Sequence, residues 1–271
     1  METYNTYDMT RVAAAFTAAL GADAPQQSNE MAEPLADLLM DAFSGKPADR
    51  AVLYLPDAIA MWLCQKYTPD FREVLRHTRL TLPLRTVMPS VTPVCFGTMF
   101  TGALPEVHGI QKYEKPVIRT DTVFDALIRA GKRCAIVSSV GASMSRIFLE
   151  REMDYFVECA GGGEALEVGL GLIAADKYDF LCIYDGWYDH TMHATAVEAP
   201  EALAEFRKNT AAFGEIVRAV QKHYARYDTF IGFATDHGCH DHPETGRGTH
   251  GTDLPEDLNV LHFYGSIGRS I

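Results

Sequence analysis

Carboxylate and imidazole side chains recur along this sequence in places where they could hold a metal ion. The six candidate ligands are Asp57, Asp189, His193, Asp236, His237 and His250. Asp189 and His193 are four positions apart, so both lie on one face if their segment is helical. Mixed carboxylate and imidazole ligands suit zinc or manganese rather than calcium. One such ion needs about three protein ligands, so this set is large enough for two divalent cations.

Thr92 is the candidate nucleophile for chemistry at such a site. Three carboxylates and two divalent cations leave one positive charge, which can bind a phosphate group and stabilise a threonine alkoxide. Two metal ions about 4 Å apart can hold both the attacking and the leaving oxygen of an in-line displacement. A threonine hydroxyl is a poor nucleophile at neutral pH, and coordination to a metal ion is one of the few ways to activate it.

The segment around Thr92 also permits a simpler interpretation. Thr92 follows a proline-flanked turn, and Pro93 suits the first position of a helix, where its missing N–H costs nothing. Thr92 would then be an N-cap, whose hydroxyl accepts a hydrogen bond from the first helical turn. The same helix start would, however, offer N–H groups and a dipole to an incoming anion. The metal-ligand candidates elsewhere in the chain favour the nucleophile.

The other candidates have alternatives as well. Asp57 could cap a helix over residues 58–65, and Asp185 is an alternative to Asp189. Any single histidine is more often a satisfied core residue than a ligand. Residues 239–242, Cys-His-Asp-His, form a rival metal-binding cluster, but they are too close in sequence to surround one ion easily. The occurrence of several candidates directly after predicted strands favours the larger set.

The elements that must position these residues alternate along the chain. Short apolar segments predict buried strands at 51–55, 134–138, 155–158, 178–184, 229–234 and 259–264. Other segments predict helices at 10–20, 31–43, 123–130, 143–151, 164–175 and 201–226. This alternation is typical of an α/β protein with a mostly parallel sheet and helices on both faces. Such folds place functional groups at the carboxyl ends of strands, where Asp57, Asp189 and Asp236 occur.

The composition limits the class of protein. The sequence shows no internal repeat or linker, so we predict one domain over residues 1–271, with residues 1–48 as an N-terminal helical packing segment. The 47% of hydrophobic and 22% of charged residues indicate a soluble globular protein. A net charge of −12 argues against nucleic acid as the main partner, because no basic block offsets it. No apolar run is long enough to predict a membrane span.

The cysteines and the start of the chain bear on localisation. The six cysteines are scattered and form no C-x-x-C pair, which favours free thiols in a reducing compartment. The first residues lack the basic and apolar regions of a signal peptide, so we expect a cytoplasmic protein. A homodimer stays open, because a small chain can complete its substrate pocket with a second subunit.

At the candidate residues, the sequence resembles the alkaline phosphatase superfamily, especially its type I phosphodiesterase/nucleotide pyrophosphatase branch. Four separated pieces match in the right order. They are residues 55–57 (Leu-Pro-Asp), residues 89–110 with Thr92 at the nucleophile position, Asp189-x-x-x-His193, and residues 235–238 (Thr-Asp-His-Gly) with 248–251 (Gly-Thr-His-Gly). Each piece alone is a weak signal, but four pieces in order are strong.

The resemblance implies a three-layer α/β/α sandwich with a mostly parallel central sheet and an alkaline-phosphatase-like core without a large cap domain. It also implies two divalent metal ions, with zinc favoured over manganese. One ion would be held by Asp57, Thr92, Asp236 and His237, and the other by Asp189, His193 and His250. Thr92 would form a covalent phospho-threonine intermediate.

Two further residues belong to the predicted substrate site. Cys95 stands three residues after Thr92, where the phosphodiesterase branch usually has an asparagine, and a thiol is a weaker hydrogen-bond donor than an amide. Trp187 offers a surface on which a leaving group could stack, although core packing explains this tryptophan equally well.

The sequence therefore predicts a metal-dependent hydrolase that acts on a small-molecule phosphoester, and it favours a phosphodiesterase or nucleotide pyrophosphatase. The alternatives that stay open are a phosphomonoesterase, a phosphomutase, a phosphonate hydrolase and a non-catalytic metal-binding relative.

Overall fold

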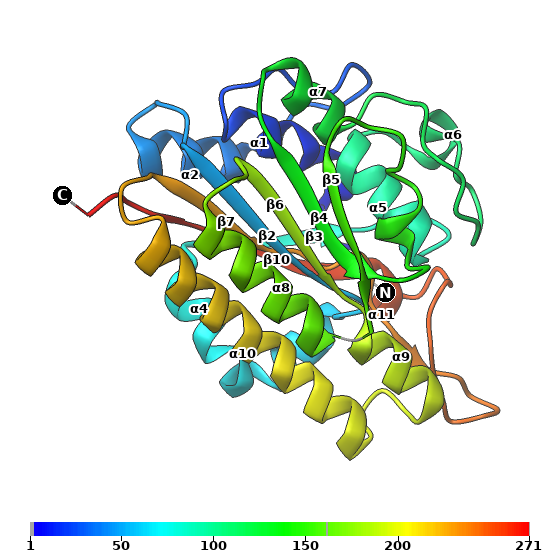
Figure 1. Cartoon of the computed structure of the whole chain (residues 1–271). Helices are drawn as coiled ribbons and strands as arrows, with labels where there is room; N and C mark the ends of the chain where they lie inside the picture. The colour runs from blue at the N-terminus through cyan, green and yellow to red at the C-terminus, as the bar shows by residue number, and fades with distance from the viewer. Residues whose placement is uncertain (1–2, 161, 271) are drawn as a thin grey trace.

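An eight-stranded sheet runs through the centre of the protein, with helices on both of its faces (Figure 1). The computed structural model describes residues 3–160 and 162–270. The strand order is β1-β3-β10-β7-β2-β6-β4-β5. These strands are β1 Tyr7–Asp8, β2 Arg50–Pro56, β3 Leu80–Arg85, β4 Cys134–Ser139, β5 Asp154–Cys159, β6 Phe180–Asp185, β7 Thr229–Phe233 and β10 Asn259–Ile267. Every pairing is parallel except those of β10, which runs antiparallel to β3 and β7.

Alternate side chains of the central strands enter two separate hydrophobic cores. On β2, Leu53 and Leu55 face one core, whereas Val52 and Tyr54 face the other. This period of two is the geometry of an extended strand, and a near-continuous apolar run is typical of a strand buried on both faces. The predicted three-layer sandwich with a mostly parallel sheet is therefore confirmed.

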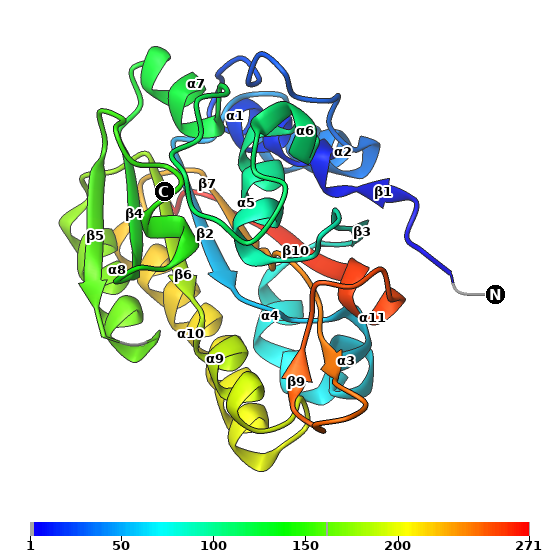
Figure 2. The same ribbon diagram turned by 90° about the vertical axis from the view of Figure 1, so that its right-hand side faces the viewer.

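One core lies under the helices α1 (Ala13–Ala18), α2 (Glu33–Phe43), α5 (Thr92–Thr101) and α7 (Val123–Arg129). The other lies under α3 (Met61–Lys66), α4 (Arg72–His77), α8 (Gly162–Ala175), α9 (Trp187–Ala194) and α10 (Pro200–His223). Figure 2 shows these two helical layers on opposite sides of the sheet. The remaining short helices are α6 (Pro105–His108) and α11 (Pro255–Leu258).

All six predicted strands are present, and most predicted helices are within a few residues of the observed ones. The helix predicted at 143–151 is wrong, because only a short 3-10 turn, Ser143–Ser145, forms there. Strand β3 was not predicted, since Pro83 and its alternating exposure weaken the pattern of a buried strand. The sequence pattern also did not reveal that β10 is antiparallel.

The strands β2, β6 and β7 lie side by side at the centre of the sheet, so their carboxyl ends meet at one edge. Loops at this edge include a small hairpin made of β8 (His240–Asp241) and β9 (Gly248–Thr249). Figure 2 shows this hairpin extending beside α9. Within the described ranges, no helix has the length and apolar character needed to cross a membrane.

Candidate metal centre and active site

The first group of candidate ligands lies at the carboxyl ends of β2 and β7. We call Asp57, Asp236 and His237 the inner ligand group. The Nε2 atom of His237 lies 3.5 Å from Asp57 Oδ1 and 3.2 Å from Asp236 Oδ2. All three side chains are buried, and one ligand atom from each lies within 4.8 Å of the others. The apolar segments of β2 and β7 end directly before these residues, which places the polar side chains at the rim of the sheet.

The second group is formed by α9 and the loop that follows β9. We call Asp189, His193 and His250 the outer ligand group, and their ligand atoms also lie within 4.8 Å of one another. Asp189 and His193 share one face of α9, as their spacing predicts. Asp189 Oδ1 lies 3.3 Å from Nε2 of both histidines. The rings of His237 and His250 stack with centroids 4.0 Å apart, so the two groups adjoin.

Each histidine of the two groups is held through its Nδ1 atom by a backbone carbonyl. His193 donates to Gly248 at 2.8 Å, and His250 donates to Ser90 at 2.8 Å. His237 donates to the Gly238 carbonyl at 3.0 Å. A carbonyl only accepts, so each of these bonds places a proton on Nδ1 and turns the Nε2 atom toward the carboxylates.

The arrangement fits two metal ions. Two carboxylate oxygens of the inner group, Asp57 Oδ1 and Asp236 Oδ2, are buried without a hydrogen-bond partner. Buried oxygens of this kind are costly unless a cation satisfies them. In addition, the Nε2 atoms of His193 and His250 lie 3.1 Å apart, and two facing lone pairs repel unless a cation or proton lies between them. The donor set of carboxylate oxygens and imidazole nitrogens suits zinc or manganese.

The electrostatics of the inner group reflect its burial. Burial and the neighbouring Asp236 carboxylate raise the pKa of Asp57 well above its usual value. Burial also raises the pKa of Asp236 to about 7. The pKa of His237 is lowered well below its usual value by burial and by the neighbouring His250. The metal-free inner group therefore favours protonated carboxyls beside a neutral imidazole.

The outer group shows the opposite pattern. The hydrogen bond with Asp189 raises the pKa of His193 to about 9. Burial acts against ionisation of Asp189, but the hydrogen bonds to His193 and His250 outweigh it and lower the carboxyl pKa. Burial likewise opposes the charge on His250, yet its bond to Asp189 leaves the pKa of this imidazole raised. Without a metal ion, the outer group thus favours an ionised carboxylate beside protonated imidazole.

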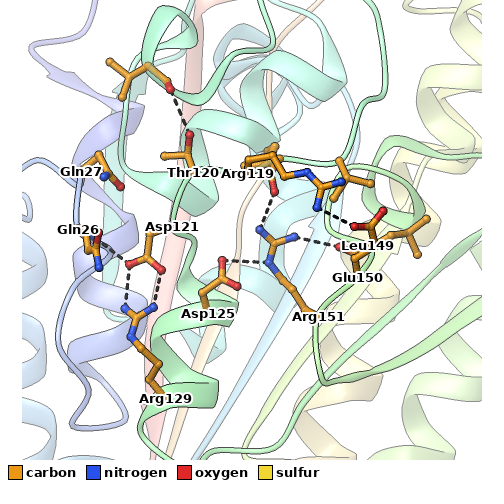
Figure 3. A pocket seen from close by; sticks show the side chains of 13 residues that line it. Gln26, Gln27, Arg119, Thr120, Asp121, Asp125, Arg129, Leu149, Glu150 and Arg151 are labelled. Atoms are coloured by element: carbon orange, nitrogen blue, oxygen red, sulfur yellow. Dashed lines mark hydrogen bonds and ion pairs between the residues drawn. The ribbon is translucent and has the colours of Figure 1, made fainter.

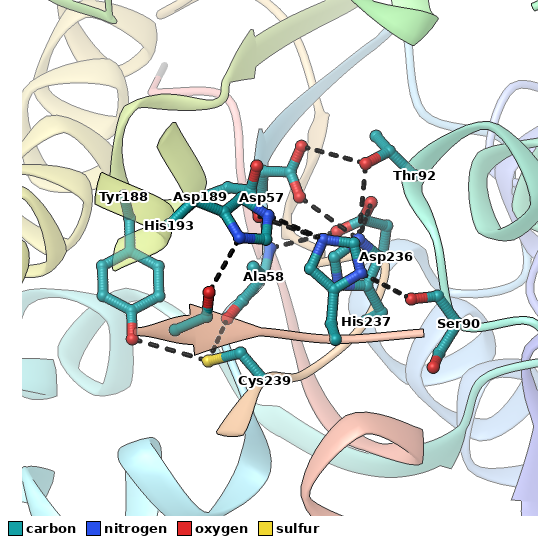
Figure 4. Close-up of polar contacts among 12 residues, drawn as sticks. Asp57, Ala58, Ser90, Thr92, Tyr188, Asp189, His193, Asp236, His237 and Cys239 are labelled. Carbon is teal, nitrogen blue, oxygen red and sulfur yellow. Dashed lines mark hydrogen bonds and ion pairs between the residues drawn. The ribbon is translucent and has the colours of Figure 1, made fainter. Parts of the chain in front are cut away.

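Thr92 lies next to the inner group. Its hydroxyl is 3.5 Å from Asp57 Oδ2 and 3.4 Å from His237 Nε2 (Figure 4). Thr92 is the first residue of α5, and Val91 is the N-cap, without a side-chain capping bond. The alternative in which the Thr92 hydroxyl caps the helix is therefore wrong. Asp57 is not a cap either, because α3 begins only at Met61 after Ala60.

The two residues predicted to contact substrate, Cys95 and Trp187, differ in their exposure. Cys95 is completely buried in the core below α5, and its thiol lies 4.0 Å from the Val87 carbonyl. It has no exposed surface at the site. Trp187 is only partly buried and begins α9. Asp185, the alternative to Asp189, binds the Trp187 N–H and the Tyr54 hydroxyl, so it supports the start of α9 instead of joining a ligand group.

Tyr184 is a residue of this site that sequence reasoning missed. Its hydroxyl donates a hydrogen bond to Asp57 Oδ2, the oxygen that also faces Thr92. The approach depends on Gly186, since a Cβ atom there would lie 2.5 Å from the Tyr184 hydroxyl. The only signal in the sequence was a tyrosine near the end of an apolar run, which packing alone explains.

A pocket of about 280 Å³ adjoins the two groups. Its lining includes Tyr184, Trp187, Asp189 and His190, together with small residues from 139–142. Its lining therefore includes both the tyrosine that binds Asp57 and a member of the outer group. A ligand whose phosphate lay at the metal centre could extend along Trp187.

A larger cavity of about 660 Å³ lies elsewhere, against α7 and the segments around 119 and 150 (Figure 3). Three arginines line it, and each is paired with a carboxylate. The pairs are Arg119–Glu150, Arg129–Asp121 and Arg151–Asp125. Its charges are thus already balanced, and the cavity contains none of the candidate ligands.

A sequence model describing type I phosphodiesterase/nucleotide pyrophosphatase matches residues 38–126. This segment contains Asp57 and Thr92. The match confirms the predicted resemblance, and it agrees with the prediction of an enzyme that hydrolyses phosphoric ester bonds. No curated protein sequence matches the chain.

Solved structures resemble the protein over a larger part of its length than this sequence match covers. An inactive threonine-to-alanine variant of murine ectonucleotide pyrophosphatase/phosphodiesterase 5, in complex with AMP, has a TM-score of 0.62 at 11% identity, over 80% of this chain and 88% of the other. Phosphonoacetate hydrolase from Sinorhizobium meliloti, in complex with phosphonoformate, has a TM-score of 0.53 at 15% identity, over 70% of this chain and 56% of the other. The chain therefore shares the fold of these structures, and its residues 38–126 match the type I phosphodiesterase/nucleotide pyrophosphatase family.

Proposed function

We propose that this chain is a metal-dependent phosphoester hydrolase of the phosphodiesterase/nucleotide pyrophosphatase type, with Thr92 as its nucleophile. The observation that carries the proposal is the position of the Thr92 hydroxyl, within 3.5 Å of both Asp57 and His237. A threonine at the start of α5 has no capping role here, and it instead faces the inner group, which adjoins the outer group. The threonine-to-alanine change in the inactive murine structure supports a nucleophilic threonine.

We further propose that the site holds two divalent cations. Asp57, Asp236, His237 and Thr92 would hold one, and Asp189, His193 and His250 the other. Three nitrogen and three carboxylate ligands favour zinc over manganese. When bound, these ions supply positive charge that lowers the pKa of an attacking hydroxyl and neutralises phosphoryl oxygens.

The reaction has two displacements. The Thr92 Oγ1 atom gives its proton to solvent water and forms a bond to phosphorus, while the bond from phosphorus to the leaving oxygen breaks on the opposite side. The leaving oxygen takes up a proton from water. A water molecule then attacks the phospho-threonine, which restores the Thr92 hydroxyl and releases a phosphomonoester. The helix α5 starts at Thr92, so the positive end of its dipole lies beside the incoming anion.

Trp187 and the 280 Å³ pocket beside Asp189 are the proposed place of the leaving group. The aromatic ring and the small residues around 139–142 suit an uncharged planar group better than a charged one. We propose no contact between Cys95 and the substrate in this conformation, because its thiol faces the Val87 carbonyl.

The test compares a bis(p-nitrophenyl) diester with the p-nitrophenyl monoester, on metal-stripped protein that is reloaded with Zn²⁺ or Mn²⁺. We expect metal-dependent hydrolysis with preference for the diester, and a loss of about a thousandfold or more in Thr92→Ala. Thr101→Ala is the matched control, since Thr101 lies on the same helix and its hydroxyl binds the Gly97 carbonyl and the Ala103 N–H, away from both ligand groups. Full turnover by Thr92→Ala would overturn the mechanism.

The similarity in fold to a phosphonate hydrolase favours phosphonate hydrolysis as the second candidate function. Product analysis separates the two, because phosphodiester cleavage gives an alcohol and a phosphomonoester, whereas phosphonate cleavage gives inorganic phosphate and a carbon acid. Preference for the monoester in the same assay would instead indicate a phosphatase. We also propose that residues 1–271 form a single cytoplasmic domain. Size-exclusion chromatography with light scattering would test whether two such chains form a homodimer.

A further inference from the structure

Residues 239–242, the rival metal-binding cluster of the sequence, do not surround a common point. Cys239, His240 and Asp241 follow directly after the inner ligands Asp236 and His237, and each side chain binds a different part of the chain. Among the described residues, this cluster is not one of the groups whose ligand atoms come close enough to hold a metal ion. These three contacts nevertheless connect the cluster, directly or through further hydrogen bonds, with the segments that carry the candidate ligands.

Cys239 binds the segment of Asp57. Its buried thiol donates to the Ala58 carbonyl at 3.3 Å (Figure 4). Ala58 has a φ of 63°, a left-handed conformation that a residue with a Cβ atom rarely adopts and that the surroundings must maintain. The Ala58 N–H donates to Asp236 Oδ1 at 3.2 Å. Ala58 is thus held on both sides, next to the first inner ligand.

His240 leads to the segment of His250. Its Nδ1 atom donates to Asp257 Oδ1 at 2.7 Å, and Asp257 is completely buried. The other oxygen of Asp257 accepts from the N–H of Thr252 at 2.9 Å and from its hydroxyl at 2.7 Å. The Thr252 carbonyl in turn accepts from the Ser90 hydroxyl, and the Ser90 carbonyl holds His250. A buried carboxylate with three donors is rigidly placed.

Asp241 leads to the segment of α9. Its Oδ1 atom accepts from the Val197 N–H at 2.8 Å, just beyond the helix that carries Asp189 and His193. Asp241 also pairs with Gly248 across the β8–β9 hairpin, and the Gly248 carbonyl holds His193. One side chain therefore fixes the end of α9 against the hairpin that orients its histidine.

We propose that Cys239, His240 and Asp241 form a positioning bracket that sets the distance between the inner and the outer ligand group for a pair of divalent cations. The inference rests on the proposed function, because it requires both groups to bind metal. The bracket residues touch no substrate and no metal ion, and they act through the backbone of the ligand-bearing segments. The loss of a residue that hydrogen-bonds directly to a metal ligand typically weakens metal binding by about 10- to 100-fold. The bracket residues act one step further away, so we expect effects at the lower end of this range.

The first test uses two substitutions of His240 and measures Zn²⁺ binding to metal-stripped protein by isothermal titration calorimetry. We expect His240→Ala to weaken binding by about tenfold or more, because Asp257 loses a donor. His240→Asn should stay within about threefold of the unmodified protein, since its amide can donate in place of Nδ1. His242→Ala is the control, as its described side-chain contact is to the nearby Glu244 N–H.

The second test uses Asp241, which is exposed, so that its replacement leaves both cores intact. Asp241→Ala removes the acceptor for the Val197 N–H, whereas Asp241→Asn keeps a carbonyl oxygen there. We expect weaker Zn²⁺ binding only for the alanine variant. The visible spectrum of Co²⁺-loaded protein should shift in the same variant, because it reports the geometry around the ion, while the melting temperature of the metal-free protein should change little.

The unmodified protein is measured first. If it does not bind two divalent cations, the proposed function itself is wrong. If it does, equal affinities of His240→Ala and the unmodified protein overturn the bracket. Equal losses in His240→Ala and His240→Asn overturn it too, since they would show that the ring is needed only for packing.

Discussion

The inner and outer ligand groups contain the same kinds of side chain but lie in different surroundings. The members of the inner group, at the ends of β2 and β7, have almost no exposed surface. In the outer group, His193 leaves 41% of its side chain exposed on α9. The inner group belongs to the rim of a rigid sheet, whereas the outer group belongs to one short helix and a loop.

This difference reverses the electrostatics. Burial raises the pKa of Asp57 and Asp236 and lowers that of His237, so the inner group disfavours charge. In the outer group the hydrogen bonds between Asp189 and the histidines favour charge on both partners. The same residue types, aspartate and histidine, therefore form a buried, rigidly held group at the sheet and a more accessible group on α9. The elements that carry them determine the difference.

The largest expected effect is the loss of an inner ligand. Asp236→Asn removes a carboxylate from a buried group that has no solvent to replace it, so we expect turnover of the diester to fall by about a thousandfold or more. Excess Zn²⁺ should not restore it. Kinetics with and without added metal would check this, and rescue by metal would contradict the fixed character of the inner group.

A smaller effect is expected for His193→Ala in the outer group. Water can reach this exposed position and replace the lost ligand, so we expect metal affinity to fall by about 10- to 100-fold and activity to recover at high Zn²⁺ concentration. Metal titration of activity in both variants tests the contrast directly. If His193→Ala and Asp236→Asn respond alike to added metal, the two groups are not functionally different.

Tyr184→Phe should have a weaker effect again. It removes the donor to Asp57 Oδ2 but leaves every candidate metal ligand in place. A hydrogen bond to a charged group contributes at least about 1.5 kcal/mol, and we expect this lower value, about a tenfold loss in kcat/KM, because Asp57 keeps its other contacts. Tyr155→Phe is a matched control, because its hydroxyl binds the Phe148 carbonyl away from the site. An unchanged kcat/KM would show that Asp57 needs no support from Tyr184.

The smallest effect concerns stability in the buried layer beneath the inner group. His262 binds the Thr235 carbonyl, directly before Asp236, and burial lowers its pKa to about 4. Between pH 6.5 and 4, His262 is therefore protonated in the unfolded chain but neutral in the folded chain. The free energy of unfolding should fall with falling pH by about 1.4 kcal/mol per unit from this residue.

Urea denaturation of metal-free protein at pH 7, 6 and 5 measures this slope, and His262→Gln should make it shallower. His108, also buried and with a pKa lowered by burial to about 4, contributes a similar slope in both proteins. An identical slope in the variant would show that His262 is protonated in the folded state.

Much of the site was predictable because its residues stand at the ends of simple patterns. Asp57, Asp236 and His237 directly follow apolar segments, and these segments became the central strands β2 and β7. Asp189 and His193 have the spacing of one helical face, and they lie on α9. Local sequence determines such features, and the parallel sheet then brings the strand ends together.

Other features were not predictable because they depend on contacts between distant segments. The sequence did not show that His237 stacks on His250, nor that Cys95 would face the core behind Thr92. It predicted a helix at 143–151, where only a turn forms. The role of Tyr184 depends on the space beside Gly186, which no periodicity reveals.

The distances along the chain between contacting residues have a consequence for the timing of assembly. The contact of Ala58 with Asp236 joins residues 178 positions apart, and that of Ser90 with His250 joins residues 160 apart. A chain emerging from the ribosome therefore carries Asp57 and Thr92 long before their partners exist. Neither group is complete until the segment 236–250 has been synthesised, so a bound cation would stabilise the completed fold and not its early intermediates. Shortage of metal would then reduce the amount of active protein without stopping its folding.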